Sequence, residues 1–394
     1  MGEEKIALGL GNNIDYEFAW NSPVLEDLIA RLHIRADELG DVPVEDLRSL
    51  IISILNFVKN SRGGQRFLQR PELVEDFAKW FNYTVSIGGT CPRSAIAMSK
   101  LGYPSRLHLV TDNEHVRRFL PEEAVGFFSS GRESIYPHLI IQYDRDIVID
   151  AGDIHIRTSR ANRIIYDNDL DNAIMKLNPA FFDNAEHIQV CLISGFNTIR
   201  DRDLLINRLD QLGDLLKGLP REVRIFYEDA GFYEPAFPGI IQDALRRYIH
   251  IYSLNEDEFM EYGGMRIDLL NPSQVYRMLG KLAEKIQAPV IVIHTKYWAL
   301  AWGEGAERYR LSLRGGITMA TTRFRFGDAL SGEKYRLTGK LDADPGGSLF
   351  CGAIEKLGGE RICCEASLLV PETRVTTVGL GDAFVGGFLP TLVV

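Results

Sequence analysis

The feature that most constrains the fold is a repeated alternation of short, β-branched apolar runs with amphipathic stretches. The runs that predict strands cover residues 5–11, 106–111, 187–194, 222–228, 250–254 and 288–295. The stretches that predict helices cover residues 24–39, 45–60, 91–102, 202–219, 239–249 and 273–287. Apolar residues recur every three or four positions in those stretches, which is typical of helices packed on a sheet. Strand followed by helix predicts an α/β fold with a doubly wound, mostly parallel sheet and helices on both faces.

One region breaks this alternation. Residues 136–167 contain several strand-like runs with no helical pattern between them. We expect consecutive antiparallel strands here, in a small β-rich lid domain that closes over a site and excludes water. The run at 83–89 fits the same sheet. The predicted lid covers about residues 61–89 and 131–168, and the predicted large catalytic domain is discontinuous, with residues 1–60, 90–130 and 169–394.

Composition narrows the class of function. The chain has 394 residues and a net charge of −10, which does not favour a nucleic-acid partner. Its five cysteines include no CxxC pair, so zinc spacing is absent and a reducing compartment is expected. No apolar run approaches the ~20 residues of a membrane span, and the N-terminus lacks a secretory pattern. We expect a cytoplasmic enzyme acting on small molecules, as a monomer or small homo-oligomer.

A glycine turn near the C-terminus, TTVGLGDAFVGGF at residues 376–388, places a carboxylate at the start of an apolar helix pattern. Gly379 and Gly381 permit unusual backbone angles, so the N–H groups around Leu380 can approach a ligand closely. Together with the positive end of a helix, those groups would form an anion hole. Asp382 would repel a resting anion, and fits better as a base that accepts a hydroxyl proton during phosphoryl transfer. The alternative is an ordinary turn with an aspartate helix cap.

Side chains with oxygen ligands follow two further predicted strands. Asn255 and Glu258 stand three residues apart just after one strand, and Glu228 closes another. At the carboxyl edge of a parallel sheet such oxygens could hold Mg²⁺ through water. The alternative for Asn255 and Glu258 is a capping box at a helix start.

Two other strand ends carry candidate ligand contacts. Asn13 and Asp15 follow the first strand and suit the hydroxyls of a sugar, and Gly88 with Gly89 would let backbone approach the same substrate. Simple turn chemistry is the alternative for both pairs. The pair His294–Thr295 closes the strand at 288–295 and could contact nucleotide phosphate or ribose. A histidine buried in the core is the alternative there.

Taken in chain order, these motifs resemble the ribokinase superfamily of sugar and nucleoside kinases, and within it the ADP-dependent glucokinase and phosphofructokinase family. The resemblance runs from about Ile6 to Leu389. Its most telling pieces are TTVGLGD, HTKYW at 294–298, LISGFN at 192–197 and NEDE at 255–258.

The resemblance implies an Mg²⁺-dependent sugar kinase that takes its phosphoryl group from ADP and releases AMP. Asp382 would be the catalytic base, and Gly379, Leu380 and Gly381 would form the anion hole. The residues implied to contact the sugar are Asn13, Asp15, Gly88 and Gly89. Those implied to organise the metal are Glu228, Asn255 and Glu258. Arg163 matches the family's asparagine–arginine pair and would bind a phosphate.

The chain departs from the family in two places. Phe226 stands where the family carries the histidine of a His-x-Glu motif, which would alter the surroundings of the metal. A glutamate shortly before Gly88 is missing, which argues against free glucose and favours fructose 6-phosphate as the acceptor. The alternatives are an ATP-dependent sugar or nucleoside kinase of the same superfamily, and a catalytically degenerate sugar- or nucleotide-binding protein.

Overall fold

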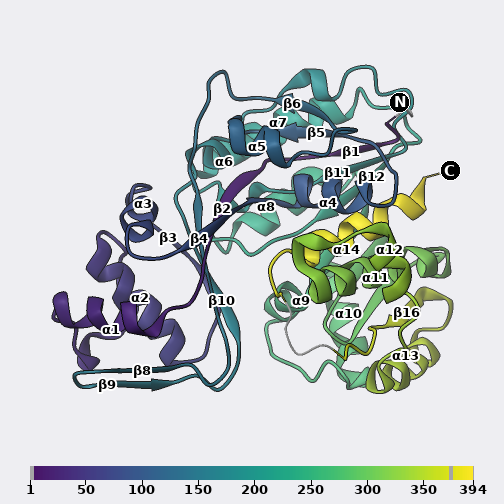
Figure 1. Ribbon diagram of the computed structural model, residues 1–394. Helices are drawn as coiled ribbons and strands as arrows, with labels where there is room; N and C mark the ends of the chain where they lie inside the picture. The colour runs from purple at the N-terminus through teal and green to yellow at the C-terminus, as the bar shows by residue number, and fades with distance from the viewer. Residues whose placement is uncertain (1–3, 372–375, 394) are drawn as a thin grey trace.

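A large twisted sheet forms the centre of the molecule in the computed structural model, which describes residues 4–371 and 376–393 (Figure 1). Within these residues the sheet has nine strands in the order β16-β15-β14-β13-β12-β11-β1-β5-β6. Their bounds are β1 Ile6–Leu8, β5 Ser105–Leu109, β6 Val125–Phe128, β11 Val190–Ile193, β12 Arg224–Glu228, β13 Ile249–Asn255, β14 Val290–His294, β15 Trp298–Gly303 and β16 Ile362–Ala366. All six predicted strands belong to this sheet.

The strand order creates a switch point beside β1. The chain runs outward from β1 through β5 on one side and through β11 to β14 on the other, and all these neighbours pair in parallel. Only β14–β15 and β15–β16 pair antiparallel within the described sheet. In open α/β sheets of this kind, ligands bind beyond the carboxyl ends of the strands near the switch point.

Helices cover both faces of the large sheet, as predicted. In β11, Val190 and Leu192 pack into one hydrophobic core while Cys191 and Ile193 pack into the other. Helices α4 (Thr90–Ser99), α11 (Arg310–Phe326) and α14 (Leu380–Phe388) cover the first face. On the second face lie α7 (Arg202–Leu216), α8 (Phe237–Leu245), α10 (Pro272–Ile286) and α13 (Pro345–Gly358). No helix in the described ranges is long and apolar enough to cross a membrane.

The remaining described helices are short or lie away from these two layers. They are α1 Ser22–Arg31, α2 Leu47–Lys59, α3 Leu73–Ala78, α5 Glu114–Phe119, α6 Leu170–Ile174, α9 Glu256–Gly263 and α12 Gly332–Thr338. The helix predicted over 24–39 ends at Arg31, because His33 takes a left-handed φ of 52° that a continuous helix cannot contain. A short 3-10 turn at Ala36–Glu38 follows it.

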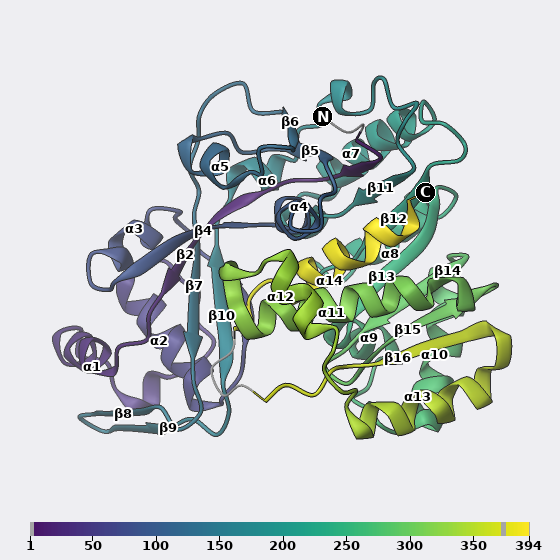
Figure 2. The same ribbon diagram turned by 45° about the vertical axis from the view of Figure 1, so that its right-hand side comes forward.

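A second, five-stranded sheet stands beside the first, with α1, α2 and α3 grouped around it (Figure 2). Its order is β3-β10-β7-β2-β4, with bounds β2 Asn13–Phe18, β3 Gly64–Phe67, β4 Tyr83–Gly88, β7 His138–Tyr143 and β10 Asn162–Asp167. The hairpin β8 (Val148–Ala151) and β9 (Ile154–Arg157) extends from it. The expected antiparallel pairing holds for β7–β10, whereas β2–β7 and β3–β10 are parallel.

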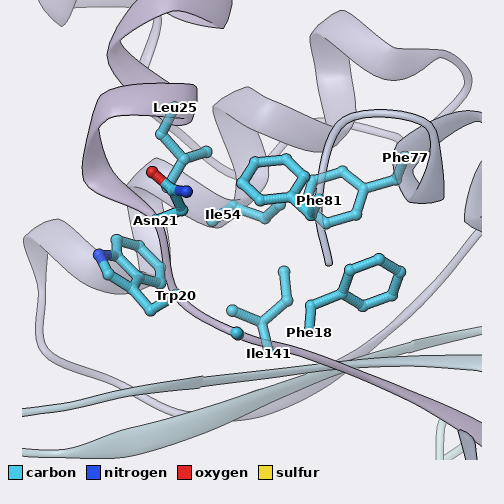
Figure 3. A pocket seen from close by; sticks show the side chains of 9 residues that line it. Phe18, Trp20, Asn21, Leu25, Ile54, Phe77, Phe81 and Ile141 are labelled. Atoms are coloured by element: carbon cyan, nitrogen blue, oxygen red, sulfur yellow. The ribbon is translucent and has the colours of Figure 1, made fainter. Parts of the chain in front are cut away.

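Strand β2, which lies between β7 and β4, was not expected in this sheet. Its residues, Asn13–Phe18, fall outside the predicted lid ranges, yet they pair with β4 on one side and β7 on the other. Figure 3 shows an apolar pocket where this sheet meets the helices, with Phe18, Phe77 and Phe81 around it. The rings of Phe77 and Phe81 stack with centroids 4.4 Å apart. Apart from Asn21 the lining is apolar, so this pocket is part of the packing that holds the second sheet rigid.

Candidate active site

The glycine turn before α14 has the backbone that its sequence predicts. Gly379 takes a φ of 69° and stands at the N-cap, so Leu380 and Gly381 form the first turn of the helix. A Cβ at Gly379 would lie 2.7 Å from Nη1 of Arg93 and 2.9 Å from Nε of Arg323. A side chain at Gly379 would therefore crowd both guanidinium groups, and the first N–H groups of α14 have no partner within the helix.

Asp382 sits in the first turn of α14 with 22% of its side chain exposed. Its backbone carbonyl accepts a hydrogen bond from Ser94 Oγ at 2.9 Å, which ties α14 to α4. Its carboxylate lies 3.8 Å from Nε of Arg93. A carboxylate that is partly exposed and held at a helix start is placed to exchange a proton with a bound ligand.

The predicted sugar-contacting residues lie together in the second sheet. Asn13 and Gly88 are partners across β2 and β4, and Asn13 Nδ2 donates to Asp15 Oδ1 at 2.5 Å. A Cβ at Gly88 would come within 2.2 Å of Asn13 Nδ2, so glycine is needed here for space. Gly89 takes a φ of 96° and leads directly into α4.

Arg93 connects this group to Asp382. It projects from the first turn of α4, only four residues after Gly89, and its Nη2 donates to Asp15 Oδ2 at 2.9 Å. The structure therefore brings the predicted base and the predicted sugar-binding aspartate to one guanidinium. The sequence motifs did not single out Arg93, since one arginine in an amphipathic pattern is normally solvated.

His138 is a second residue that the motifs missed. It opens β7 directly opposite Asp15, with its Nε2 3.3 Å from Asp169 Oδ2 and its Nδ1 4.0 Å from Asp15 Oδ1. Burial alone would lower the pKa of His138, but Asp169, Asp167 and Asp15 together raise it to about 9. His138 is therefore an imidazolium at neutral pH and offsets the negative charge around Asp15.

This pKa predicts a pH dependence of stability. A folded-state pKa above the ordinary value of ~6.5 means that His138 stabilises the fold fully below pH ~6.5. The stabilisation is lost as pH rises through about 9, a change of ~3 kcal/mol in the free energy of unfolding. Urea unfolding between pH 6.5 and 9.5 measures it. His138→Gln should flatten that slope, and an unchanged slope in this variant would assign the effect to another group.

On the other side of the glycine turn, Glu228 ends β12 and His294 ends β14. Glu228 Oε1 lies 3.0 Å from His294 Nε2, while its buried Oε2 has no hydrogen-bond partner among the described residues. The His294 ring stacks on Phe384 of α14 with centroids 4.6 Å apart. His294 thus joins the carboxylate of β12 to the helix that carries the glycine turn.

Asn255 and Glu258 form a capping box at the start of α9. Glu258 Oε2 accepts from the Asn255 backbone N–H at 2.8 Å, and Asn255 Oδ1 accepts from the Glu258 N–H at 3.1 Å. Burial, and then the charge of Asp229, raise the pKa of Glu258 well above its usual range. Burial also raises the pKa of Asp229 to about 6, although Tyr252 and Tyr262 donate to it. Glu258 and Asp229 thus form a buried acidic cluster beside Glu228.

No three histidine, cysteine or acidic side chains in the described part of the chain are arranged to hold a metal ion directly. The orphaned Oε2 of Glu228 and the crowded charge around Glu258 nevertheless fit a cation held through water. The capping box that sequence reasoning offered as an alternative is therefore present, and it fixes the orientation of both side chains.

Arg163 and Thr295, which were also predicted, lie at the edge of the candidate site. Arg163, in β10, donates from Nη1 to the Thr377 carbonyl at 2.7 Å. The Thr295 hydroxyl donates to the Trp298 carbonyl at 2.9 Å in the turn between β14 and β15. Thr295 is therefore engaged in its own turn, while Arg163 joins the second sheet to the glycine turn.

Three solved structures with a similar fold are described as kinases. A phosphofructokinase from Pyrococcus horikoshii OT3 with AMP matches with a TM-score of 0.78 and 16% identity, over 98% of this chain and 97% of that one. An ADP-dependent kinase in complex with fructose 6-phosphate and ADPβS matches with a TM-score of 0.73 and 14% identity, over 98% and 93%. The last common ancestor of ADP-dependent phosphofructokinases from Methanosarcinales gives 0.71 and 14%, over the same shares.

Comparison with curated protein sequences found no match. A family profile described as the ADP-specific phosphofructokinase/glucokinase conserved region matches residues 4–389. The chain belongs to this family, which makes it an ADP-dependent carbohydrate kinase.

Proposed function

We propose that the protein transfers the terminal phosphoryl group of ADP to a hydroxyl of a sugar phosphate, most favourably fructose 6-phosphate, and releases AMP. The observation that carries this proposal is the convergence of Asp382 and Asp15 on one buried guanidinium. It sets a proton acceptor from the large sheet beside a hydroxyl-binding carboxylate from the second sheet. A kinase needs both groups at the same point, where the acceptor oxygen attacks phosphorus.

In this mechanism Asp382 removes the proton from the attacking hydroxyl as the oxygen approaches the terminal phosphorus in line with the leaving AMP. The N–H groups of Leu380 and Gly381, at the positive end of α14, donate to the phosphoryl oxygens in flight. Asn13, Asp15 and the backbone of Gly88 and Gly89 orient the sugar. The ends of β13 and β14, including His294 and Thr295, face the donor nucleotide.

Mg²⁺ would be held through water by Glu228, Asn255 and Glu258, where it would neutralise charge on the diphosphate. The fit rests on the unpaired, buried Oε2 of Glu228 and on the mutual repulsion of its acidic neighbours. In the protein itself, His294 orients Glu228 through the 3.0 Å contact with Oε1. That contact leaves the second carboxylate oxygen free to accept a hydrogen bond from a water molecule.

The second sheet would serve as the lid of the active site. It carries Asn13 and Asp15 on β2, Gly88 on β4 and Arg163 on β10. We place the lid in residues 61–89 and 131–168, together with β2 and the helices α1 and α2 that stand around the same sheet, and the catalytic domain in the large sheet and its helices. Closing the sheet onto α14 would remove water from the transferred phosphoryl group.

We infer that the acceptor is a sugar phosphate from the positive charge of Arg163. Arg163 is exposed beside the glycine turn, and within the described residues its guanidinium donates to one backbone carbonyl. A guanidinium in this position suits the phosphate of a sugar phosphate. Related structures support this direction, because one holds fructose 6-phosphate with ADPβS and another is a phosphofructokinase with AMP.

We predict that Arg163→Met lowers kcat/KM for fructose 6-phosphate by roughly 10- to 100-fold, since one charge-assisted hydrogen bond is worth ~1.5–3 kcal/mol. The rate with an unphosphorylated sugar should change little. Steady-state assays with fructose 6-phosphate and glucose measure both. Arg157→Met is the matched control, because Arg157 pairs with Asp146 away from the glycine turn. Equal losses on both sugars would contradict a phosphate contact at Arg163.

A further inference from the structure

Arg93 is the most completely surrounded cation near the glycine turn. Only 6% of its side chain is exposed. Its Nη2 lies 2.9 Å from Asp15 Oδ2, 3.3 Å from Ser86 Oγ and 3.5 Å from Glu17 Oε1. Its Nε lies 3.8 Å from Asp382 Oδ2. The guanidinium therefore touches β2 and β4 of the second sheet and α14 of the large one.

The charge balance explains why Arg93 is held there. Asp15, Glu17 and Asp382 bring three carboxylates to one place, and no other guanidinium of the described residues lies within ion-pair distance of them. Burial alone would lower the pKa of Arg93, but these carboxylates raise it, so the group stays charged. A buried charge of this kind is tolerated only when it is paired on several sides.

The shape of the group matters as much as its charge. A guanidinium is planar and offers donors on different edges, so it can meet two carboxylates in a fixed relative orientation. A lysine ammonium is a point charge on a flexible side chain, so it would pair with one carboxylate and leave the other without its partner. In this structure Nη2 of Arg93 donates to Asp15, and Nε is the nitrogen that lies 3.8 Å from Asp382.

We propose that Arg93 is a positioning residue for phosphoryl transfer, which sets the separation between the hydroxyl-binding Asp15 and the base Asp382. This inference rests on the proposed function. Asp15 holds the acceptor while Asp382 takes its proton, so a change in their separation would move the attacking oxygen away from the base. Arg93 is buried, and its Nη2 donates to Asp15 and Ser86, so we assign it a positioning role and not a role as base or nucleophile.

The primary test compares Arg93→Lys with Arg323→Lys. Arg323 is also a buried arginine beside Gly379, but it donates to the Val378 carbonyl and pairs with Asp328. Both variants keep the buried charge, so both should fold. We expect Arg93→Lys to lower kcat with fructose 6-phosphate at least 30-fold, with KM for ADP within about twofold of the wild type. Arg323→Lys should lose much less. A wild-type kcat in folded Arg93→Lys, or equal losses in the two variants, would overturn the positioning role.

A second measurement does not depend on turnover. Asp15→Asn and Asp382→Asn are combined in a double-mutant cycle, and the urea midpoint of unfolding is recorded for each protein. We expect the two changes to be non-additive in the wild-type background and additive in the Arg93→Lys background. If the wild type transfers no phosphoryl group to any sugar, the proposed function fails, but this cycle still shows whether Arg93 couples Asp15 to Asp382. Additive shifts in both backgrounds would overturn the positioning role of Arg93.

Discussion

Asp382→Asn should lower kcat by ~10³- to 10⁴-fold, because asparagine has nearly the same shape as aspartate and cannot accept the hydroxyl proton. The variant should fold, since the Asp382 contact to α4 runs through its backbone carbonyl and Ser94 Oγ. ADP should bind with nearly unchanged affinity, because the glycine turn and the ends of β13 and β14 are intact. Release of AMP from ADP in the presence of fructose 6-phosphate measures turnover, and calorimetry measures ADP binding.

The control for this variant is Asp328→Asn. Asp328 pairs with Arg323 at 2.8 Å, and its side chain is 73% exposed, so it lies near the same turn outside the reacting centre. It should retain most of the wild-type kcat. Full activity in Asp382→Asn would show that Asp382 is not the catalytic base. Equal losses of kcat in the two variants would indicate a general effect of charge around the turn.

The second large effect is expected at Gly379. Gly379→Ala puts an L side chain at a φ of 69°, which costs ~1–2 kcal/mol. It also puts a Cβ 2.7 Å from Nη1 of Arg93. The turn must move, and its N–H groups then miss the transferring phosphoryl group. We expect kcat to fall by ~10²-fold, as measured in the same assay.

Gly264→Ala separates backbone strain from loss of the anion hole. Gly264 has a φ of 70° in the same left-handed region at the end of α9, and a Cβ there would meet nothing within 4 Å. This variant should lose stability to a similar extent and keep its activity. If Gly379→Ala loses stability alone, with kcat unchanged, then the turn does not donate to the transferred group.

The large sheet could be predicted because its strands are buried on both faces. Such strands are nearly continuous apolar runs, and VCLI at 190–193 or VIVIH at 290–294 stand out from their surroundings. The strand β2 could not be recognised in the same way. Its sequence NIDYEF carries polar residues that point toward the proposed site, so the run was interpreted as a turn that follows β1.

The glycine turns near the site were predictable because each is a local pattern with its own backbone requirement. Arg93 and His138 were not, because their partners are remote in the sequence. Arg93 meets Asp15 across a separation of 78 residues, and the pairing of β2 with β7 alone brings His138 to Asp15. Neither residue has a local signature that separates it from a solvated arginine or an ordinary strand histidine.

The two departures from the family pattern have different surroundings. Phe226 packs against Phe388 in the core, and the imidazole that contacts Glu228 is His294 of β14, which belongs to the HTKYW motif. Two residues before Gly88, Ser86 donates from Oγ to Glu17 Oε1 of β2 at 2.5 Å. Both contacts depend on strand order, which the sequence alone does not display.

A matrix of donors and acceptors tests the central claim most directly. The purified protein is incubated with Mg²⁺ and with ADP, ATP, GDP or pyrophosphate as donor, against fructose 6-phosphate and glucose as acceptors. The account predicts that ADP with fructose 6-phosphate gives AMP and a bisphosphorylated sugar in equal amounts, and that Asp382→Asn gives neither. Transfer from ATP without transfer from ADP, or binding of both substrates without any AMP at high enzyme concentration, would contradict it.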